Sequence, residues 1–122
     1  MTLPSTTDVG RAVATYFDAW RARDFDTLRG VLDDDVTFVG PLGRADNADE
    51  CLAGLRGLRE ILSDIAVERT FVDGDDVLTW FTLHTTVAGE VGPVVNWCHV
   101  ENGKITRIRV TFDPRPLIAA GS

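Results

Sequence analysis

The second half of the chain alternates four segments rich in β-branched and aromatic residues with short turn sequences, and this pattern constrains the fold most. Each turn contains glycine, aspartate or asparagine, which favour tight reversals of the backbone. Consecutive strands joined by short turns pair in antiparallel order. The predicted strands are residues 66–72, 77–87, 94–100 and 105–112.

The first half of the chain has helical periodicity instead. Asp8 is the predicted N-cap of a helix over residues 8–23. Asp24 is the predicted cap of a second helix, which the aspartate run 33–35 ends before a short strand over residues 36–39. A third helix follows, and its apolar positions recur at helical spacing. Those positions are Leu52, Leu55, Leu58, Leu62 and Ile65.

Helices segregated to one end of an antiparallel meander define an α+β architecture. The length of 122 residues fits a single domain over residues 1–122. Residues 1–7 are polar and aperiodic, so we expect a loose N-terminal tail, and the last residues are expected to be irregular. Gly54 and Gly57, which are poor helix formers, either permit a close approach of another element or weaken the third helix.

The charge balance excludes two classes of partner. The net charge is −7, from 19 acidic and 12 basic residues, and no basic stripe is present. Nucleic acid and anionic membrane surfaces are therefore not expected as partners. The sequence has neither a signal-peptide pattern nor a long apolar run, so a cytoplasmic location is expected.

The two cysteines, Cys51 and Cys98, are not spaced as metal ligands with each other or with the histidines. We expect both to be reduced and buried, and we expect no metal site.

Four local motifs in this order carry a family resemblance. They are residues 16–26 (YFDAWRARDFD), 32–38 (LDDDVTF), 100–105 (VENGKI) and 112–114 (FDP). The chain resembles the nuclear-transport-factor-2-like superfamily, and within it the SnoaL-like domains, a group that includes polyketide cyclases. The resemblance implies a cone-shaped, curved antiparallel sheet wrapped around N-terminal helices, with an apolar pocket between them. It further implies a small apolar organic ligand, no cofactor, and a homodimer through the outer sheet face.

Three catalytic patterns of the superfamily match only in part. The ketosteroid isomerase pattern places its tyrosine on Tyr16 and its second oxyanion donor on Asn96, but its carboxylate base falls on Gly40, which cannot take a proton. The limonene epoxide hydrolase pattern lacks its Arg-x-Asp element, and only Asp113 is available. The SnoaL-like cyclase pattern places its acid/base on Asp113, with Asn96 near an expected histidine position.

Each candidate catalytic residue has a structural alternative. Asp113 is either the acid/base or a cap of the strand end before Pro114. His84 shares a strand face with Trp80, which lines the pocket or forms an interface. Asn96 either offers its amide to a ligand carbonyl or bonds across the sheet.

Two functions follow from these alternatives. The first is a cofactor-free enzyme that transfers a proton on an apolar carbonyl compound, in a cyclisation or isomerisation, with Asp113, His84 and Asn96 as catalytic residues. The second is a non-catalytic binding domain for a small apolar ligand. An enzyme requires at least two ionisable groups aimed at one spot, whereas a binder requires only shape and an apolar lining. The expected ligand-binding residues are Tyr16, Trp80, Phe38, Phe112, Val110 and Cys98.

Overall fold

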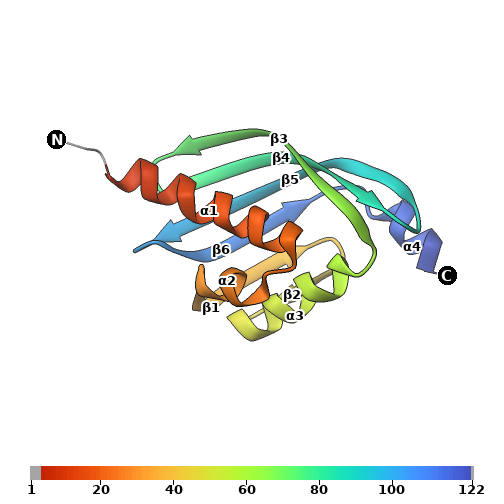
Figure 1. Cartoon of the computed structure of the whole chain (residues 1–122), viewed down its shortest axis with the longest axis horizontal. Helices are drawn as coiled ribbons and strands as arrows, with labels where there is room; N and C mark the ends of the chain where they lie inside the picture. Colours follow the sequence, from red (N-terminus) through yellow and green to blue (C-terminus); the bar gives the residue numbers. More distant parts are fainter. Residues whose placement is uncertain (1–3, 122) are drawn as a thin grey trace.

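The computed structural model describes residues 4–121, and it describes side chains over residues 8–119. Helices come first along the chain and long strands follow (Figure 1). The elements are α1 (Pro4–Ala22), α2 (Phe25–Gly30), β1 (Leu32–Gly40), β2 (Gly43–Ala45), α3 (Ala48–Arg59), β3 (Leu62–Asp73), β4 (Asp76–Thr85), β5 (Gly89–Glu101), β6 (Lys104–Thr111) and α4 (Arg115–Gly121).

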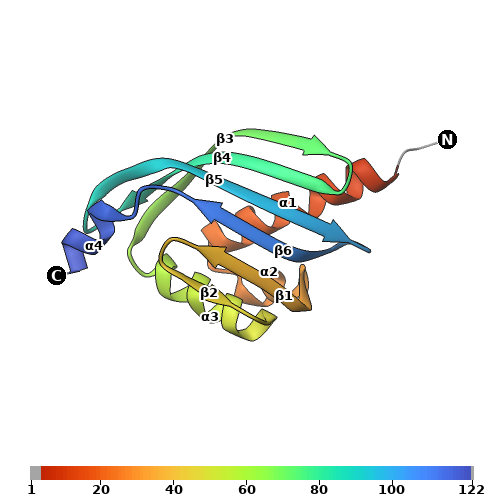
Figure 2. The ribbon, with the colours of Figure 1, turned by 180° about the vertical axis from the view of Figure 1, so that it is seen from behind.

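The strands form one curved six-stranded sheet in the order β2-β1-β6-β5-β4-β3. The meander from β3 to β6 is antiparallel throughout, as predicted. Strand β1 instead pairs in parallel with β6, and β2 folds back on β1 as an extra short strand at the edge of the sheet. Helices α1, α2 and α3 lie on one side of the sheet (Figure 1). The opposite face of the sheet, seen from behind in Figure 2, is not covered by these helices. The predicted α+β class with a curved sheet is confirmed.

Two predicted element boundaries were wrong for the same physical reason. The aspartates 33–35 belong to β1 rather than to a helix end, and Leu62 and Ile65 belong to β3 rather than to the third helix. In both strands an irregularity in the pairing register interrupts the alternation of faces. Such a bulge places buried residues three or four positions apart, which is also the spacing of a helix face.

The chain ends also differ from the expectation. Residues 4–7 of the predicted loose tail, and Asp8, lie inside α1, while residues 1–3 lie outside the described residues. The C-terminal segment, predicted to be irregular, forms α4. The prediction of Asp24 as an N-cap is confirmed, because its side chain accepts a hydrogen bond from the backbone N–H of Thr27 at 3.2 Å.

The core lies between α1 and the concave face of the sheet. Phe17 of α1 meets Phe81 of β4 edge to face, with the ring centroids 5.0 Å apart. Tyr16 and Trp20 pack beside Phe17, and all three side chains are buried. Aromatic burial of this extent stabilises the seating of α1 on the sheet.

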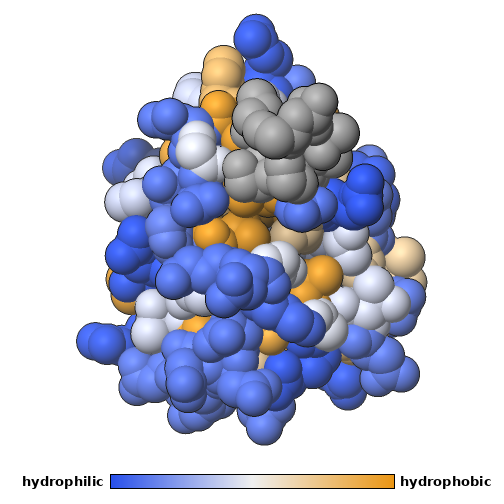
Figure 3. Space-filling model, turned by 90° about the vertical axis from the view of Figure 1, so that its left-hand side faces the viewer, coloured by the Kyte–Doolittle hydropathy of each residue, from blue (hydrophilic) through white to orange (hydrophobic). Residues whose placement is uncertain are grey.

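The end of the molecule that carries the β3–β4 and β5–β6 turns has a mostly hydrophilic surface, with a small apolar area (Figure 3). Among the described helices, none is both long enough and apolar enough to cross a bilayer.

Arg59 ties α1 to α3. Its guanidinium, although charged, is buried, and it donates hydrogen bonds to the backbone carbonyls of Trp20, Arg21 and Leu62. Carbonyls in the last turn of a helix have no partner within the helix, so Arg59 satisfies part of the C-terminus of α1. Burial lowers the pKa of the Arg59 guanidinium.

We expect Arg59→Met to lower the free energy of unfolding by about 2 kcal/mol or more, because the charged hydrogen bonds are lost and buried carbonyls are left without donors. Urea unfolding followed by circular dichroism measures the change. Arg56→Met is the matched control on the same helix, since Arg56 is exposed and stacks on Phe25. Equal destabilisation by the two substitutions would contradict the assignment.

Candidate functional site

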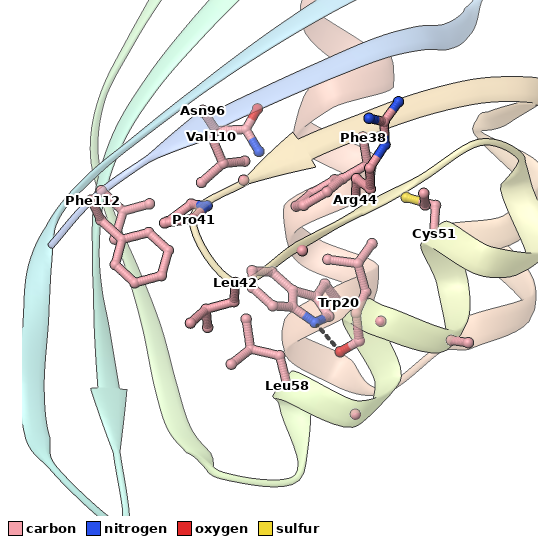
Figure 4. Close-up of a pocket in the computed structure, with 18 of the residues that line it drawn as sticks. Trp20, Phe38, Pro41, Leu42, Arg44, Cys51, Leu58, Asn96, Val110 and Phe112 are labelled. Atoms are coloured by element: carbon pink, nitrogen blue, oxygen red, sulfur yellow. Dashed lines mark hydrogen bonds between the residues drawn. The ribbon is translucent and has the colours of Figure 1, made fainter. Parts of the chain in front are cut away.

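A cavity of about 490 Å³ opens between the concave face of the sheet, α1, α3 and the β1–β2 turn. This volume lies within the range of roughly 300–1,000 Å³ that is typical of small-molecule sites. Figure 4 shows side chains from the sheet and from the helices converging on the space. The lining is apolar over most of its area, and its labelled apolar members are Trp20, Phe38, Pro41, Leu42, Leu58, Val110 and Phe112.

The mouth of the cavity is built from a turn and from small residues. Pro41 and Leu42 come from the β1–β2 turn, and Gly54 and Gly57 face them from α3. A Cβ atom added at either glycine would meet no heavy atom within 4 Å. The glycines therefore do not serve a close approach between elements, one of the two predicted roles, and their missing side chains leave the mouth open.

One corner of the cavity is polar. Tyr16 of α1 and Asn96 of β5 both line the cavity, and Cys51 of α3 lies on the wall beside them. The side chain of Asn96 hydrogen-bonds Tyr16, and its Oδ1 accepts a hydrogen bond from the Cys98 thiol at an S···O distance of 2.9 Å. All four side chains are buried.

The groups of this polar corner are neutral at neutral pH. Burial raises the pKa of Tyr16 well above its ordinary value, although the hydrogen bond from Asn96 opposes the shift. Burial also raises the pKa of the Cys51 thiol to about 12 and shifts the pKa of Cys98 in the same direction. The corner consequently offers hydrogen bonds without charge.

Among the described residues, the charged side chains that line the cavity are Arg44 of β2 and Glu50 of α3. Arg44 is largely exposed and pairs with Asp46 at 3.5 Å. Glu50 accepts a hydrogen bond from the backbone N–H of Asp46 at 2.9 Å, while its own N–H donates to Asn47, the N-cap of α3. This reciprocal arrangement is a capping pattern, so Glu50 has a structural role at the helix start.

Five of the predicted site residues line the cavity and four do not. The lining includes Tyr16, Phe38, Asn96, Val110 and Phe112. Cys98 is buried behind the lining, where it contacts Asn96.

The structure places His84 and Trp80 on the opposite face of the sheet from the cavity. Phe81 and Leu83, their neighbours on β4, point inward and line the cavity, so alternation turns His84 and Trp80 outward. His84 lies 3.9 Å from the carboxylate of Glu90 and is partly exposed. The expectation that His84 acts in the pocket and that Trp80 lines it is corrected by this geometry.

Asp113 also lies outside the cavity lining. It follows β6, and its carboxylate accepts hydrogen bonds from the Arg115 backbone N–H and guanidinium at 2.8–3.1 Å. These bonds lower the pKa of Asp113 to about 2, whereas a general base requires a raised pKa. The capping alternative describes Asp113, and the acid/base role does not fit its position.

Sequence reasoning missed several lining residues on α3 and β2. Cys51, Gly54 and Gly57 recur at a spacing of three along α3, and this small-residue face was the available signal. Within the described part of the chain, no three His, Cys, Asp or Glu side chains gather in a way that could hold a metal ion.

The raised pKa values of the two thiols predict that both cysteines react slowly with thiol reagents in the folded protein. At about pH 8, an increase in pKa from about 9 to about 12 lowers the thiolate fraction of Cys51 about a thousandfold. We expect both cysteines to react with Ellman's reagent at least that much more slowly in the folded protein than in concentrated guanidinium chloride. Rapid release of one equivalent of thionitrobenzoate from the folded protein would contradict this prediction.

The sequence comparison matches a large part of the chain to one family. The family model of the SnoaL-like domain matches residues 13–108. No curated protein is significantly similar to the chain in sequence.

Solved structures share the fold over almost the whole chain. A protein from Kribbella flavida is 30% identical, with 91% of each chain covered and a TM-score of 0.85. An LEH-like epoxide hydrolase of M. tuberculosis is 28% identical, with 94% of this chain and 90% of that chain covered and a TM-score of 0.77. An NTF2-like protein of unknown function from Cytophaga hutchinsonii is 23% identical, with 90% and 94% covered and a TM-score of 0.79.

Proposed function

Because this chain belongs to the family of SnoaL-like domains, and because one fold can carry unrelated activities, we propose a function from the site itself. We propose that the cavity binds a small apolar organic molecule without changing it chemically. The observation that carries this proposal is the neutral character of the polar corner formed by Tyr16, Asn96 and Cys51.

Proton-transfer catalysis requires an acid and a base that reach the same substrate atom. The carboxylate and imidazole predicted for that task, Asp113 and His84, both lie outside the lining. A binding site requires instead a shaped apolar wall and a few polar groups that fix orientation. Trp20, Phe38 and Phe112 supply such a wall, and Asn96 supplies a polar group.

The second candidate is a cofactor-free enzyme that moves a proton on an apolar carbonyl compound, in a cyclisation or isomerisation. Glu50 favours it, because its carboxylate belongs to the lining. Its bond to the Asp46 N–H argues for a structural role instead. If the wild type turns over a bound compound and Glu50→Gln does not, the result would favour the enzyme.

Ligand binding is tested by thermal unfolding with a panel of ketones, steroids and terpene epoxides. A ligand at about one hundred times its Kd adds about 2.7 kcal/mol to the free energy of unfolding, so the wild-type Tm rises by several degrees. Gly54→Leu is expected to remove the rise by filling the mouth.

Gly54→Ala is the matched control for this substitution. Its methyl group enters open space and improves helix propensity by up to about 1 kcal/mol, so we expect a slightly more stable protein that still binds. Binding that is equally strong in Gly54→Leu would place the ligand outside the cavity.

We also propose that a second copy of the chain covers the outer sheet face. Large apolar side chains are exposed there on adjacent strands, since Leu78 pairs with Phe71 on one side and with Trp97 on the other. Trp80 lies two residues along β4 on the same face. A contiguous apolar area of this kind is typical of an interface rather than of a free surface.

The substitution Leu78→Glu is expected to convert a dimer into a monomer in sedimentation velocity, because it buries a charge in the contact. Val87→Glu is the control, because Val87 is exposed to a similar extent as Leu78 (51% and 43%). Val87 lies in the β4–β5 turn, whereas Leu78 lies on the face of β4. A wild-type protein that sediments as a monomer would refute the proposed dimer.

A further inference from the structure

The sheet wall of the cavity contains a position without a side chain, Gly40 of β1. We infer that Gly40 is a specificity-determining residue, because the ring of Phe38 leans along the strand into the space that a side chain at position 40 would occupy. The cavity thereby keeps the width to admit bulky polycyclic ligands, which a larger residue at this position would exclude. This inference rests on the proposed binding function and adds the size class of the ligand.

The first step is the contact between Gly40 and the Phe38 ring. The two residues are two apart on β1, so both belong to the concave face of the sheet. Both line the cavity. A Cβ atom added at Gly40 would lie 3.1 Å from Cε1 and 3.5 Å from Cζ of the Phe38 ring. The first of these distances is shorter than a favourable contact between carbon atoms, so the outer end of the ring occupies the place of a side chain at position 40.

The second step is the direction in which the Phe38 ring can move. Val36, the preceding residue on this face of β1, is fully buried in the core. Val110 of the neighbouring strand β6 lies on another side, and its Cβ would be 3.6 Å from a Cβ added at Gly40. Phe38 itself is only half-buried and borders the cavity. A side chain at position 40 would therefore push the ring toward the open space of the cavity.

The third step concerns the wall across the cavity. Figure 4 shows Phe38 and Val110 on the sheet side of the space, with Leu58 of α3 across from them. On the α3 wall, Gly54 and Gly57 also lack side chains. The cavity of about 490 Å³ is thus widened by glycine from the sheet and from the helix, and a raised Phe38 ring would narrow it between these walls.

The backbone does not require glycine at position 40. Gly74, Gly89 and Gly103 have φ values in the left-handed region, whereas Gly40 is not among these residues. Glycine in a strand loses more conformational entropy on folding than alanine does, and it often marks a close approach of another group. The close group at Gly40 is the Phe38 ring, so the missing side chain is explained by the shape of the cavity wall.

The test compares 2-acetylnaphthalene, which has two fused rings, with 1-acetylpyrene, which has four. The Kd of each is obtained from quenching of the tryptophan fluorescence, to which Trp20 of the cavity lining contributes. We expect the wild type to bind both probes. In Gly40→Ala the displaced ring narrows the cavity, so the affinity for the pyrene is expected to fall at least about tenfold and that for the naphthalene less than about twofold.

Gly43→Ala is the matched control across the same turn. Gly43 pairs with Gly40 between β2 and β1, and a Cβ atom added at Gly43 would meet no heavy atom within 4 Å. The new methyl group cannot push the Phe38 ring, so we expect the ratio of the two affinities to stay as in the wild type.

A double variant tests whether Gly40 acts through Phe38. A leucine side chain ends short of the outer ring atoms, so in Phe38→Leu the methyl group added by Gly40→Ala has no ring to displace. We expect Gly40→Ala to weaken pyrene binding in the wild-type background and not in Phe38→Leu, which makes the two substitutions non-additive. A distortion of the β1–β2 turn would instead weaken binding equally in both backgrounds.

The outcomes separate the inference from the proposed function. If the wild type binds neither probe and no compound of the thermal-unfolding panel while its fold is intact, the proposed function and the inference both fail. If it binds other compounds but not the pyrene, only the inference fails. The inference alone also fails if Gly40→Ala leaves the affinity ratio unchanged, or changes it equally in Phe38→Leu.

The same pair of substitutions covers the case in which Gly40→Ala does not fold. The inference then requires Phe38→Leu to restore folding, because removal of the ring relieves the contact. A double variant that also fails to fold, while Phe38→Leu alone folds, would overturn the inference.

Discussion

The cavity depends on a reciprocal exchange of hydrogen bonds between two helix ends. Trp20 of α1 donates its indole N–H to the carbonyl of Leu55 in α3 at 2.9 Å, while Arg59 of α3 donates to the carbonyls of Trp20 and Arg21. Each helix thus satisfies buried carbonyls of the other, which would otherwise be a cost. The two helices are joined at this point, and α3, which packs on β1 and β2, forms one wall of the cavity.

Much of the fold follows from local patterns, and the errors have a common cause. The turns between β3 and β6 were readable because glycine, aspartate and asparagine punctuate runs of β-branched residues. The boundaries at Leu62 and near Asp33 were misjudged because bulged strands imitate helical spacing. The parallel pairing of β1 with β6 joins segments about seventy residues apart, and no local pattern indicates it.

The residues that share a strand face were predictable from the sequence, but the face that points into the cavity was not. Alternation correctly grouped His84 with Trp80, and Asn96 with Cys98. Which group points inward on β4 was undecidable from the sequence, since Leu78 and Trp80 on one face are as apolar as Phe81 and Leu83 on the other. Asn96 was placed through the family resemblance, whereas the role of the α3 glycines depends on where that helix lies in space.

The shared use of β4 and β5 by two surfaces has a consequence for how this protein can evolve. Each strand gives alternate residues to the cavity and to the outer face, as Phe81 and Trp80 do. Insertion or deletion of one residue in either strand would exchange these roles along the remainder of the strand and expose the interior to water, unless a bulge absorbs it, as in β5 opposite Phe81 and Leu83. Within these strands, descendants of this sequence can therefore acquire new ligands by replacing single side chains, whereas changes of length are confined to the bulges, the turns and the mouth.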